Sequence, residues 1–440
     1  MKKYILLCIC LCTYAMALAQ ESNTETYSLT YTVDTLQSKV LKDDRALKVY
    51  LPEGYDAQQK YPVVYITDAQ TSNFTTAMTY MHAMMEGALL PKCILVGIVQ
   101  KDRWNELEVS YKENGKRFKD YIFEEVVPYI DAQYSTSGYN VMVGHSDGAE
   151  YNQHLLLEKE NPFASFISCS TNFNTPMEEA LGTFFKEYTG KPIYYFIANV
   201  KYEVPERIAA GNLMERLAVE AANPKIQLTL QTYKAQHESI VIRALQDGLL
   251  YVFQNYRNLD AYADFKEYAD HYQQDIATYY GFVPQFEYMD VDYYFGKILD
   301  EKDIAGYEFM VQFSNQHNIF FGNYVDEANS YFYMEAYPQT IVSYNRALND
   351  MEGIQKNVFM GNLFRVLKAY EHENDLKGAV KFMEASIKKL PEYKLELSYL
   401  LGKFCKEQHI QEAKGKRLWA YCKKNYHENR AFTQADLEAL

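Results

Sequence analysis

A serine flanked by two glycines is the feature of this sequence best suited to chemistry. It lies in Gly144-His145-Ser146-Asp147-Gly148, which follows the apolar run Val141–Val143 and precedes a segment of helical character. Glycines at these positions let a strand and a helix approach closely around a sharp turn, and the turn holds the hydroxyl at the helix N-terminus, where negative charge is stabilised. The pattern therefore predicts Ser146 as a nucleophile. A chance occurrence in a loop would not explain the flanking strand and helix.

A nucleophilic serine needs a base, and only two histidines follow it before residue 257. His154 lies about 12 Å farther along the expected helix at ~1.5 Å per residue, so we expect a surface or packing role for it. His237 lies between an expected strand, 226–233, and a helix. A loop at the sheet edge would present a base there. We therefore predict His237 as the base.

The acid that orients the histidine is less narrowly defined. No aspartate occurs between Asp147 and His237, so a glutamate must serve. Glu203 and Glu206 alone follow the C-terminal end of an expected strand, 193–198, where the ligands of parallel sheets gather. Glu203 is preferred because it is nearer the strand. Glu206 is the alternative, and a serine–histidine pair without an acid also stays open.

Serine attack on a carbonyl group places negative charge on the oxygen, which needs two backbone N–H donors. The amide of Asp147, directly after the nucleophile, is one expected donor. The other is expected in the loop 68–70, after the apolar run 62–67, with Gln70 preferred. The side chain of Asp147 has no part in this chemistry, and we expect it to face solvent or to cap the following helix.

The rest of the sequence indicates neither a metal nor a cofactor. It contains no Gly-x-Gly-x-x-Gly, Walker, His-Glu-x-x-His or Cys-x-x-Cys pattern. The net charge of −14 argues against a nucleic-acid partner, because nucleic-acid binding rewards basic patches. We expect a small-molecule or carbohydrate substrate, and any protein partner is expected at the C-terminal part.

Residues 1–19 have the layout of a secretory signal peptide. Two lysines open it, an apolar stretch follows, and Ala17-Leu18-Ala19 forms an A-x-A cleavage site. The apolar stretch is shorter than the ~20 residues of a membrane span, and no later span is expected. The sequence thus predicts a secreted protein, with the periplasm as the expected compartment. Four cysteines remain after cleavage: Cys93 and Cys169 are expected core thiols, and whether Cys405 and Cys422 pair is open.

The elements that must position the serine alternate between strands and helices as far as residue 257. An entry hairpin is expected from 28–33 and 46–51, and the apolar positions from Phe118 to Ile130 mark a helix leading to the serine. The continuous apolar runs typical of buried strands lie at 62–67, 93–99, 164–169, 193–198 and 226–233. This pattern predicts an α/β domain over residues 20–257, with a mainly parallel central sheet and helices on both faces.

Residues 258–440 are expected to form a separate all-helical domain. Small residues recur at Ala305, Thr340, Ala379 and Ala413, with spacings of 35, 39 and 34. These spacings resemble the period of tetratricopeptide repeats, which stack helix pairs. The alternative is an irregular helical bundle.

Several stretches of the α/β part resemble the esterase family that includes enterochelin esterases, esterase D and related feruloyl and acetylxylan esterases. They are residues 61–68, 96–98 with Arg103 downstream, the helix at 118–134, and the serine motif at 144–148. The resemblance covers about residues 25 to 257. It implies an α/β-hydrolase fold with Ser146 as nucleophile, His237 as base and Glu203 as acid.

Three features depart from the family pattern. Ala69 follows Asp68 where members often have a glycine, and Ala149 replaces a second glycine after the serine motif. The segment 199–203 lacks the glycine usual before the acid, which weakens the assignment of Glu203. Because the family covers several ester classes, it does not define the substrate.

These inferences lead to a secreted serine esterase acting on a siderophore-type ester or an acylated carbohydrate through an acyl-enzyme. Acyl transfer to an acceptor other than water would use the same residues. The alternative, from a different class, is a non-catalytic binding or assembly protein that uses the hydrolase fold as a scaffold and the helical repeats to hold a partner.

Overall fold

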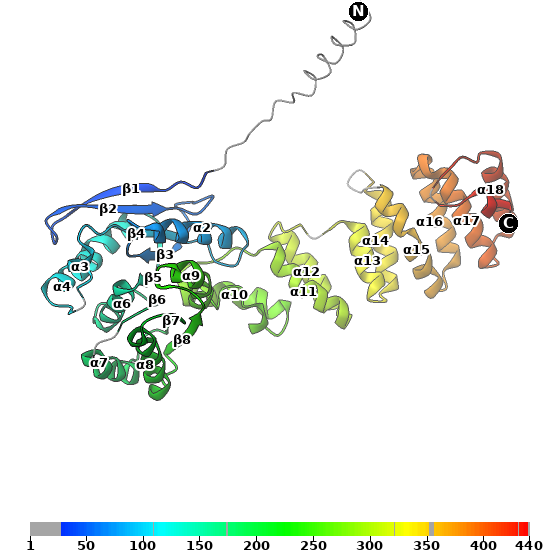
Figure 1. The fold of residues 1–440 in the computed structure, drawn as a ribbon. Helices are drawn as coiled ribbons and strands as arrows, with labels where there is room; N and C mark the ends of the chain where they lie inside the picture. Colours follow the sequence, from blue (N-terminus) through cyan, green and yellow to red (C-terminus); the bar gives the residue numbers. More distant parts are fainter. Residues whose placement is uncertain are drawn as a thin grey trace, which may run out of the picture. The chain divides into compact units, whose positions relative to one another are not determined.

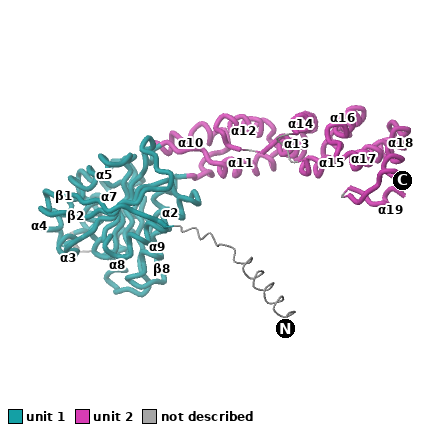
Figure 2. The backbone as a smooth tube through the Cα atoms, turned by 90° about the horizontal axis from the view of Figure 1, so that it is seen from above, with its two compact units in different colours: residues 1–256, 278–282 teal, residues 257–277, 283–440 magenta. Residues whose placement is uncertain are grey.

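The chain forms two compact units in the computed structural model, which describes residues 28–108, 110–172, 175–320, 322–351, 356–429 and 431–438. One unit comprises residues up to 256 together with 278–282, and the other comprises 257–277 and 283–440 (Figure 2). The predicted signal peptide lies outside the described residues. Within the described ranges, no helix combines the length and the apolar character that crossing a membrane requires.

The first unit is built around an eight-stranded sheet with the order β1-β2-β4-β3-β5-β6-β7-β8 (Figure 1). The pairings β1–β2 and β2–β4 are antiparallel, and all the others are parallel. The predicted mainly parallel sheet is therefore confirmed. The strands are β1 (Thr32–Ser38), β2 (Asp43–Tyr50), β3 (Tyr61–Ile66), β4 (Ile94–Ile98), β5 (Thr136–His145), β6 (Ser165–Cys169), β7 (Ile193–Val200) and β8 (Ile226–Tyr233).

Helices cover both faces of this sheet. Consecutive residues of a strand point to opposite faces. Phe166 of β6 belongs to the core cluster that contains Tyr151, whereas Ile167 contacts Gly248 on the other side. Tyr151 lies in α6 and Gly248 in α9, so these two helices cover opposite faces. The helices and turns of this unit are α2 (Ser72–Glu86), α3 (Arg103–Glu106), α4 (Glu113–Asp120), α5 (Val127–Gln133), α6 (Asp147–Leu157), α7 (Thr175–Glu187), α8 (Pro205–Ala221), η2 (His237–Ser239) and α9 (Ile240–Val252).

The expected helix through Phe118 and Ile130 forms, but a π-helical segment, η1 (Tyr121–Val126), interrupts it between α4 and α5. Pro128 lies in the first turn of α5. Proline has no N–H to donate to the carbonyl four residues earlier, and its ring clashes with that carbonyl. A wider turn just before the proline relieves both problems.

Among the described residues of the second unit, all the regular secondary structure is helical. Thr340 and Ala379 are fully buried, as the repeat pattern requires, whereas Ala305 and Ala413 are exposed. The tetratricopeptide-like period therefore stays a prediction. The helices and turns are η3 (Leu259–Ala261), α10 (Phe265–Tyr280), α11 (Tyr288–Glu301), α12 (Ile304–Gln316), α13 (Tyr324–Tyr333), α14 (Tyr337–Asn349), α15 (Lys356–His372), α16 (Leu376–Lys389), η4 (Pro391–Tyr393), α17 (Lys394–Glu407), α18 (Glu412–Lys424) and α19 (Gln434–Glu438).

Two smaller expectations concern buried polar side chains. Cys93 and Cys169 are buried free thiols, as predicted, and Cys405 and Cys422 are also free rather than paired. His154 is buried and stacks on Tyr111 with 4.2 Å between the ring centroids, which confirms the expected packing role.

Candidate active site

Ser146 lies at the sharp turn between β5 and α6, with φ of 60° and ψ of −122°. A positive φ costs energy for a residue with a Cβ, so the surrounding structure must hold it in place. A Cβ on Gly144 would lie 2.1 Å from the carbonyl oxygen of Gly148, and a Cβ on Gly148 would lie 2.7 Å from the Thr67 hydroxyl oxygen. Both flanking positions therefore require glycine, as the sequence pattern indicates.

His237 and Glu203 lie together at the carboxyl ends of neighbouring strands. His237 opens η2 after β8, and Glu203 lies in the turn after β7; these strands are adjacent in the sheet (Figure 1). The imidazole Nδ1 is 2.6 Å from the Glu203 carboxylate. The Glu203 side chain is 9% exposed and that of His237 is 25% exposed. Glu206 is exposed, and no ion pair or hydrogen bond to His237 is found for it among the described residues.

His145, which precedes the serine, holds His237 on its other side. The two rings lie 4.7 Å apart, and His145 Nε2 is 2.9 Å from the backbone carbonyl of His237. Because a carbonyl only accepts, Nε2 must donate. Burial lowers the pKa of His145 and the neighbouring His237 lowers it further, so this ring is neutral near pH 7. The base expected from the sequence is thus anchored directly beside the serine motif.

The carboxylate of Glu203 is stabilised in its charged form. Burial raises the pKa of Glu203, but hydrogen bonds from the Val204 amide, the Ser170 hydroxyl and His237 outweigh burial, and the pKa is lowered from its ordinary value. Glu203 is therefore ionised near pH 7. A charged acceptor on Nδ1 directs the proton of a neutral imidazole to that nitrogen and leaves Nε2 as the basic one.

Ser170 is a site residue that the sequence analysis missed. Its hydroxyl oxygen is 2.9 Å from the Glu203 carboxylate and 3.0 Å from Nδ1 of His237. Ser170 directly follows β6 and has a positive φ of 55°, like Ser146 after the neighbouring β5. Arg207 donates to its backbone carbonyl at 2.8 Å. The sequence offered one sign of this role, because Ser170 directly follows an apolar run. Serines are too common in loops for that position to identify a site residue.

Asp147 does not face solvent or cap the helix, so that expectation is wrong. Its side chain is buried and pairs with Arg103 at 2.8 Å. The same guanidinium binds Asp68 at 2.7 Å and the carbonyl of His145 at 3.3 Å. A buried carboxylate requires such a partner. Arg103 therefore ties the loop after β3 to the serine motif.

The predicted oxyanion donors lie in the two segments that Arg103 joins. Gln70 lies two residues after Asp68, whose φ of 59° turns the chain after β3. The side-chain oxygen of Gln70 accepts from the backbone amide of Gln100 at 3.1 Å. Among the described residues, neither the amide of Gln70 nor that of Asp147 has a hydrogen-bond acceptor. Two unsatisfied donors on adjacent segments are what an oxyanion site requires. Their role stays a prediction.

Part of the first unit matches a model of a known protein family. Residues 38–189 match a family model described as "Putative esterase". The uncharacterised protein YjcH of Bacillus subtilis is 28% identical over 151 residues, which are 33% of this chain and 62% of that protein. The chain thus spans less than two thirds of that curated relative.

Two solved structures share the fold. An IroE-like serine hydrolase from Shewanella oneidensis aligns with a TM-score of 0.53 and 20% identity, over 65% of this chain and 99% of its own. An uncharacterised protein from Capnocytophaga ochracea aligns with a TM-score of 0.59 and 15% identity, over 78% of this chain and 100% of its own. The α/β-hydrolase fold predicted from the sequence is confirmed.

Proposed function

We propose that this chain, which matches an esterase family model over residues 38–189, is a secreted serine esterase with Ser146, His237 and Glu203 as its catalytic triad. The observation that carries the proposal is the 2.6 Å contact between His237 Nδ1 and Glu203, with His237 held against the residue that precedes Ser146. Nucleophile, base and acid follow one another along the chain in the order used by hydrolases with this serine turn. The family match supports ester bonds as the target.

The proposed reaction has two halves. Ser146 Oγ forms a bond to the ester carbonyl carbon while its proton moves to Nε2 of His237, and the amides of Gln70 and Asp147 receive the oxyanion. The tetrahedral intermediate expels the alcohol, which takes the proton from His237. Water then attacks the acyl-enzyme with His237 again as base, and the acid is released. Glu203 keeps the imidazole in the required tautomer throughout, and the steps need no metal or cofactor.

The proposed substrate is a siderophore-type ester or an acylated carbohydrate. Two large aromatic side chains adjoin site residues in the sequence and are highly exposed: Trp104, next to Arg103, at 77%, and Tyr202, next to Glu203, at 67%. Both substrate classes carry rings, and exposed aromatic side chains can stack on rings. These exposed aromatics support a ring-bearing ester over a simple aliphatic one.

A fluorophosphonate probe tests the proposal. It reacts with a serine only where an adjacent base activates it, so we expect one labelled peptide, the one containing Ser146. Labelling should be lost in Ser146→Ala and kept in Ser110→Ala, which alters an exposed serine in a turn. Folded protein that stays unlabelled at Ser146 would contradict the proposal. Hydrolysis of catechol-type, feruloyl and acetyl-sugar esters then ranks the substrates, and product analysis with added alcohols separates hydrolysis from acyl transfer.

Loss of the Ser170 hydroxyl should weaken catalysis and shift its pH dependence. Ser170→Ala removes a hydrogen bond to a charged group, worth ~1.5 kcal/mol, so kcat/KM should fall about tenfold. That bond lowers the pKa of Glu203. Its loss raises the pKa, the carboxylate is protonated at higher pH, and the acid limb of the kcat/KM profile should move upward.

Ser170→Gly is the matched variant for this test. Glycine tolerates the positive φ of 55° better than alanine, so the two variants should differ in stability. If the hydroxyl acts through Glu203, both variants should show the same upward shift of the acid limb. An unchanged pH profile in both would leave Ser170 with a purely structural role.

The second candidate function is binding of a partner by the helical unit without catalysis. A cavity of about 600 Å³ in this unit is lined by Phe295, Phe332 and Phe364 among others. Grooves of stacked helix pairs often hold partners. The absence of fluorophosphonate labelling would favour this alternative.

A further inference from the structure

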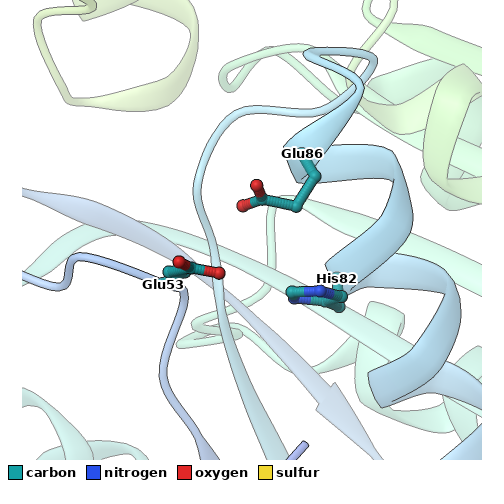
Figure 3. Close-up of side chains that lie close together, drawn as sticks. All are labelled: Glu53, His82 and Glu86. Atoms are coloured by element: carbon teal, nitrogen blue, oxygen red, sulfur yellow. The ribbon is translucent and has the colours of Figure 1, made fainter. Parts of the chain in front are cut away.

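Glu53, His82 and Glu86 converge on one point at the surface of the first unit (Figure 3). His82 and Glu86 are four residues apart on α2, so they project from the same face of the helix. Glu53 reaches them from the turn between β2 and β3. One potential ligand atom from each residue lies within 4.8 Å of the others. None of the three takes part in the proposed ester chemistry.

This cluster concentrates negative potential. Among the described residues, neither Glu53 nor Glu86 forms an ion pair, and Lys92 donates to the backbone carbonyl of Glu53 at 2.8 Å rather than to its carboxylate. Glu86 is also the last residue of α2, whose final turn contains no basic residue. A helix C-terminus carries partial negative charge, so a carboxylate there is unfavourable without a cation. Three sources of negative potential therefore meet at one point.

The imidazole of His82 is held in an orientation suited to metal binding. Its Nδ1 is 3.0 Å from the hydroxyl of Tyr50, a residue only 4% exposed. The two rings also pack edge to face, with centroids 6.5 Å apart. Metal-binding histidines typically donate one ring N–H to a fixed partner, which directs the lone pair of the other nitrogen at the metal. In the tautomer that donates from Nδ1 to the Tyr50 hydroxyl, Nε2 carries the lone pair that a metal ion binds.

We propose that Glu53, His82 and Glu86 bind one Zn²⁺ ion, with water completing the coordination. One imidazole nitrogen and two carboxylate oxygens suit zinc, whereas Ca²⁺ and Mg²⁺ prefer oxygen ligands alone. Bonds of ~2.0–2.1 Å in a tetrahedron place the ligand atoms roughly 3.3 Å apart, so the side chains must close in slightly from their present separation. Both glutamates are exposed and can make that adjustment.

The bound ion would fasten the turn before β3 to the end of α2. The N-cap of this helix, Thr71, follows the predicted oxyanion residue Gln70, but His82 lies about 16 Å farther along the helix axis at ~1.5 Å per residue. The zinc is therefore a structural ion, independent of the ester chemistry. Its binding should be measurable whether or not the protein hydrolyses esters.

The test is zinc titration of chelator-stripped protein, followed by calorimetry and thermal unfolding. We expect one Zn²⁺ per chain, and a Tm about 5 °C higher when zinc is in ~100-fold excess over its dissociation constant. Glu53→Gln and Glu86→Gln should each weaken binding by about tenfold or more, since loss of a partner behind a ligand already costs ~10–100-fold. Without zinc, Glu86→Gln should be at least as stable as the unmodified protein because it removes the charge at the helix end.

Glu187→Gln is the matched control, because Glu187 is the exposed last residue of another helix, α7. It should bind zinc and gain stability like the unmodified protein. The proposal is overturned if the unmodified protein binds no zinc, or if Glu53→Gln/Glu86→Gln binds it equally well. It is also overturned if Ca²⁺ stabilises as strongly as Zn²⁺ and His82→Asn keeps that effect, since the cluster would then only attract cations by charge.

Discussion

Ser146→Ala should lower kcat/KM for a short p-nitrophenyl ester by about 10⁴–10⁶-fold, with the protein still folded. The hydroxyl is the proposed nucleophile, and its loss leaves only binding and the oxyanion donors, whose effect over water is ~10³–10⁴-fold in serine hydrolases. Alanine lacks only the hydroxyl oxygen of serine and tolerates φ of 60° no worse than serine does. The expected loss is thus chemical, and circular dichroism with steady-state kinetics can establish it.

The neighbouring serine serves as the control for this prediction. Ser170→Ala removes a hydroxyl from the same region, at a similar positive φ, and should cost only about tenfold. Comparable losses in the two variants would show that Ser146 has no special role. Equal rates in Ser146→Ala and the unmodified protein would remove the proposed mechanism altogether.

Glu203→Gln should lower kcat/KM by about 10⁴-fold while changing the shape of the site little. The carboxylate accepts from His237 Nδ1 at 2.6 Å, whereas an amide can turn its NH₂ group to that nitrogen. The imidazole proton would then sit on Nε2, which could no longer accept a proton from Ser146. The wrong tautomer in serine proteases costs ~10⁴-fold, and kcat/KM with KM nearly unchanged measures it here.

Glu206→Gln is the control that the chain itself offers. Glu206 lies three residues from Glu203, in the first turn of α8, and is exposed. Its substitution should leave kcat/KM within about twofold, since exposed changes of this kind rarely exceed ~0.5 kcal/mol. A large loss in Glu206→Gln combined with a small one in Glu203→Gln would reassign the acid. Small losses in both would favour a serine–histidine pair without an acid.

Sequence patterns were most informative for strands marked by continuous or alternating apolar residues. The run at 226–233 is observed as β8 with the same bounds, and those at 62–67 and 93–99 differ from β3 and β4 by a residue at each end. The entry hairpin was less well located, because β1 begins at Thr32 and runs to Ser38. This edge strand is mostly polar and exposed, so no apolar alternation marks its bounds.

Sequence patterns could not predict which charged side chains form ion pairs at the site. Asp147 was expected to face solvent or to cap the following helix because the serine chemistry does not need its side chain. Its partner Arg103 lies 44 residues earlier in the chain, and the same guanidinium also donates to Asp68. Only packing of the loops after β3 and β4 against β5 brings these three groups together, and burial then makes the pairing necessary.

The sequence by itself determined the fold class, the turn around Ser146 and the two elements flanking it, because these depend on local periodicity and on glycines that sterics demand. It also narrowed the base to His237 by exclusion along the chain. Only the tertiary structure decided which glutamate meets that histidine, and that His145 and Ser170 complete its surroundings. The physical reason is that these contacts join the carboxyl ends of four adjacent parallel strands, β5 to β8. Whether two side chains meet at this edge of the sheet depends on the geometry of the turns after the strands, which spacing along the chain does not determine.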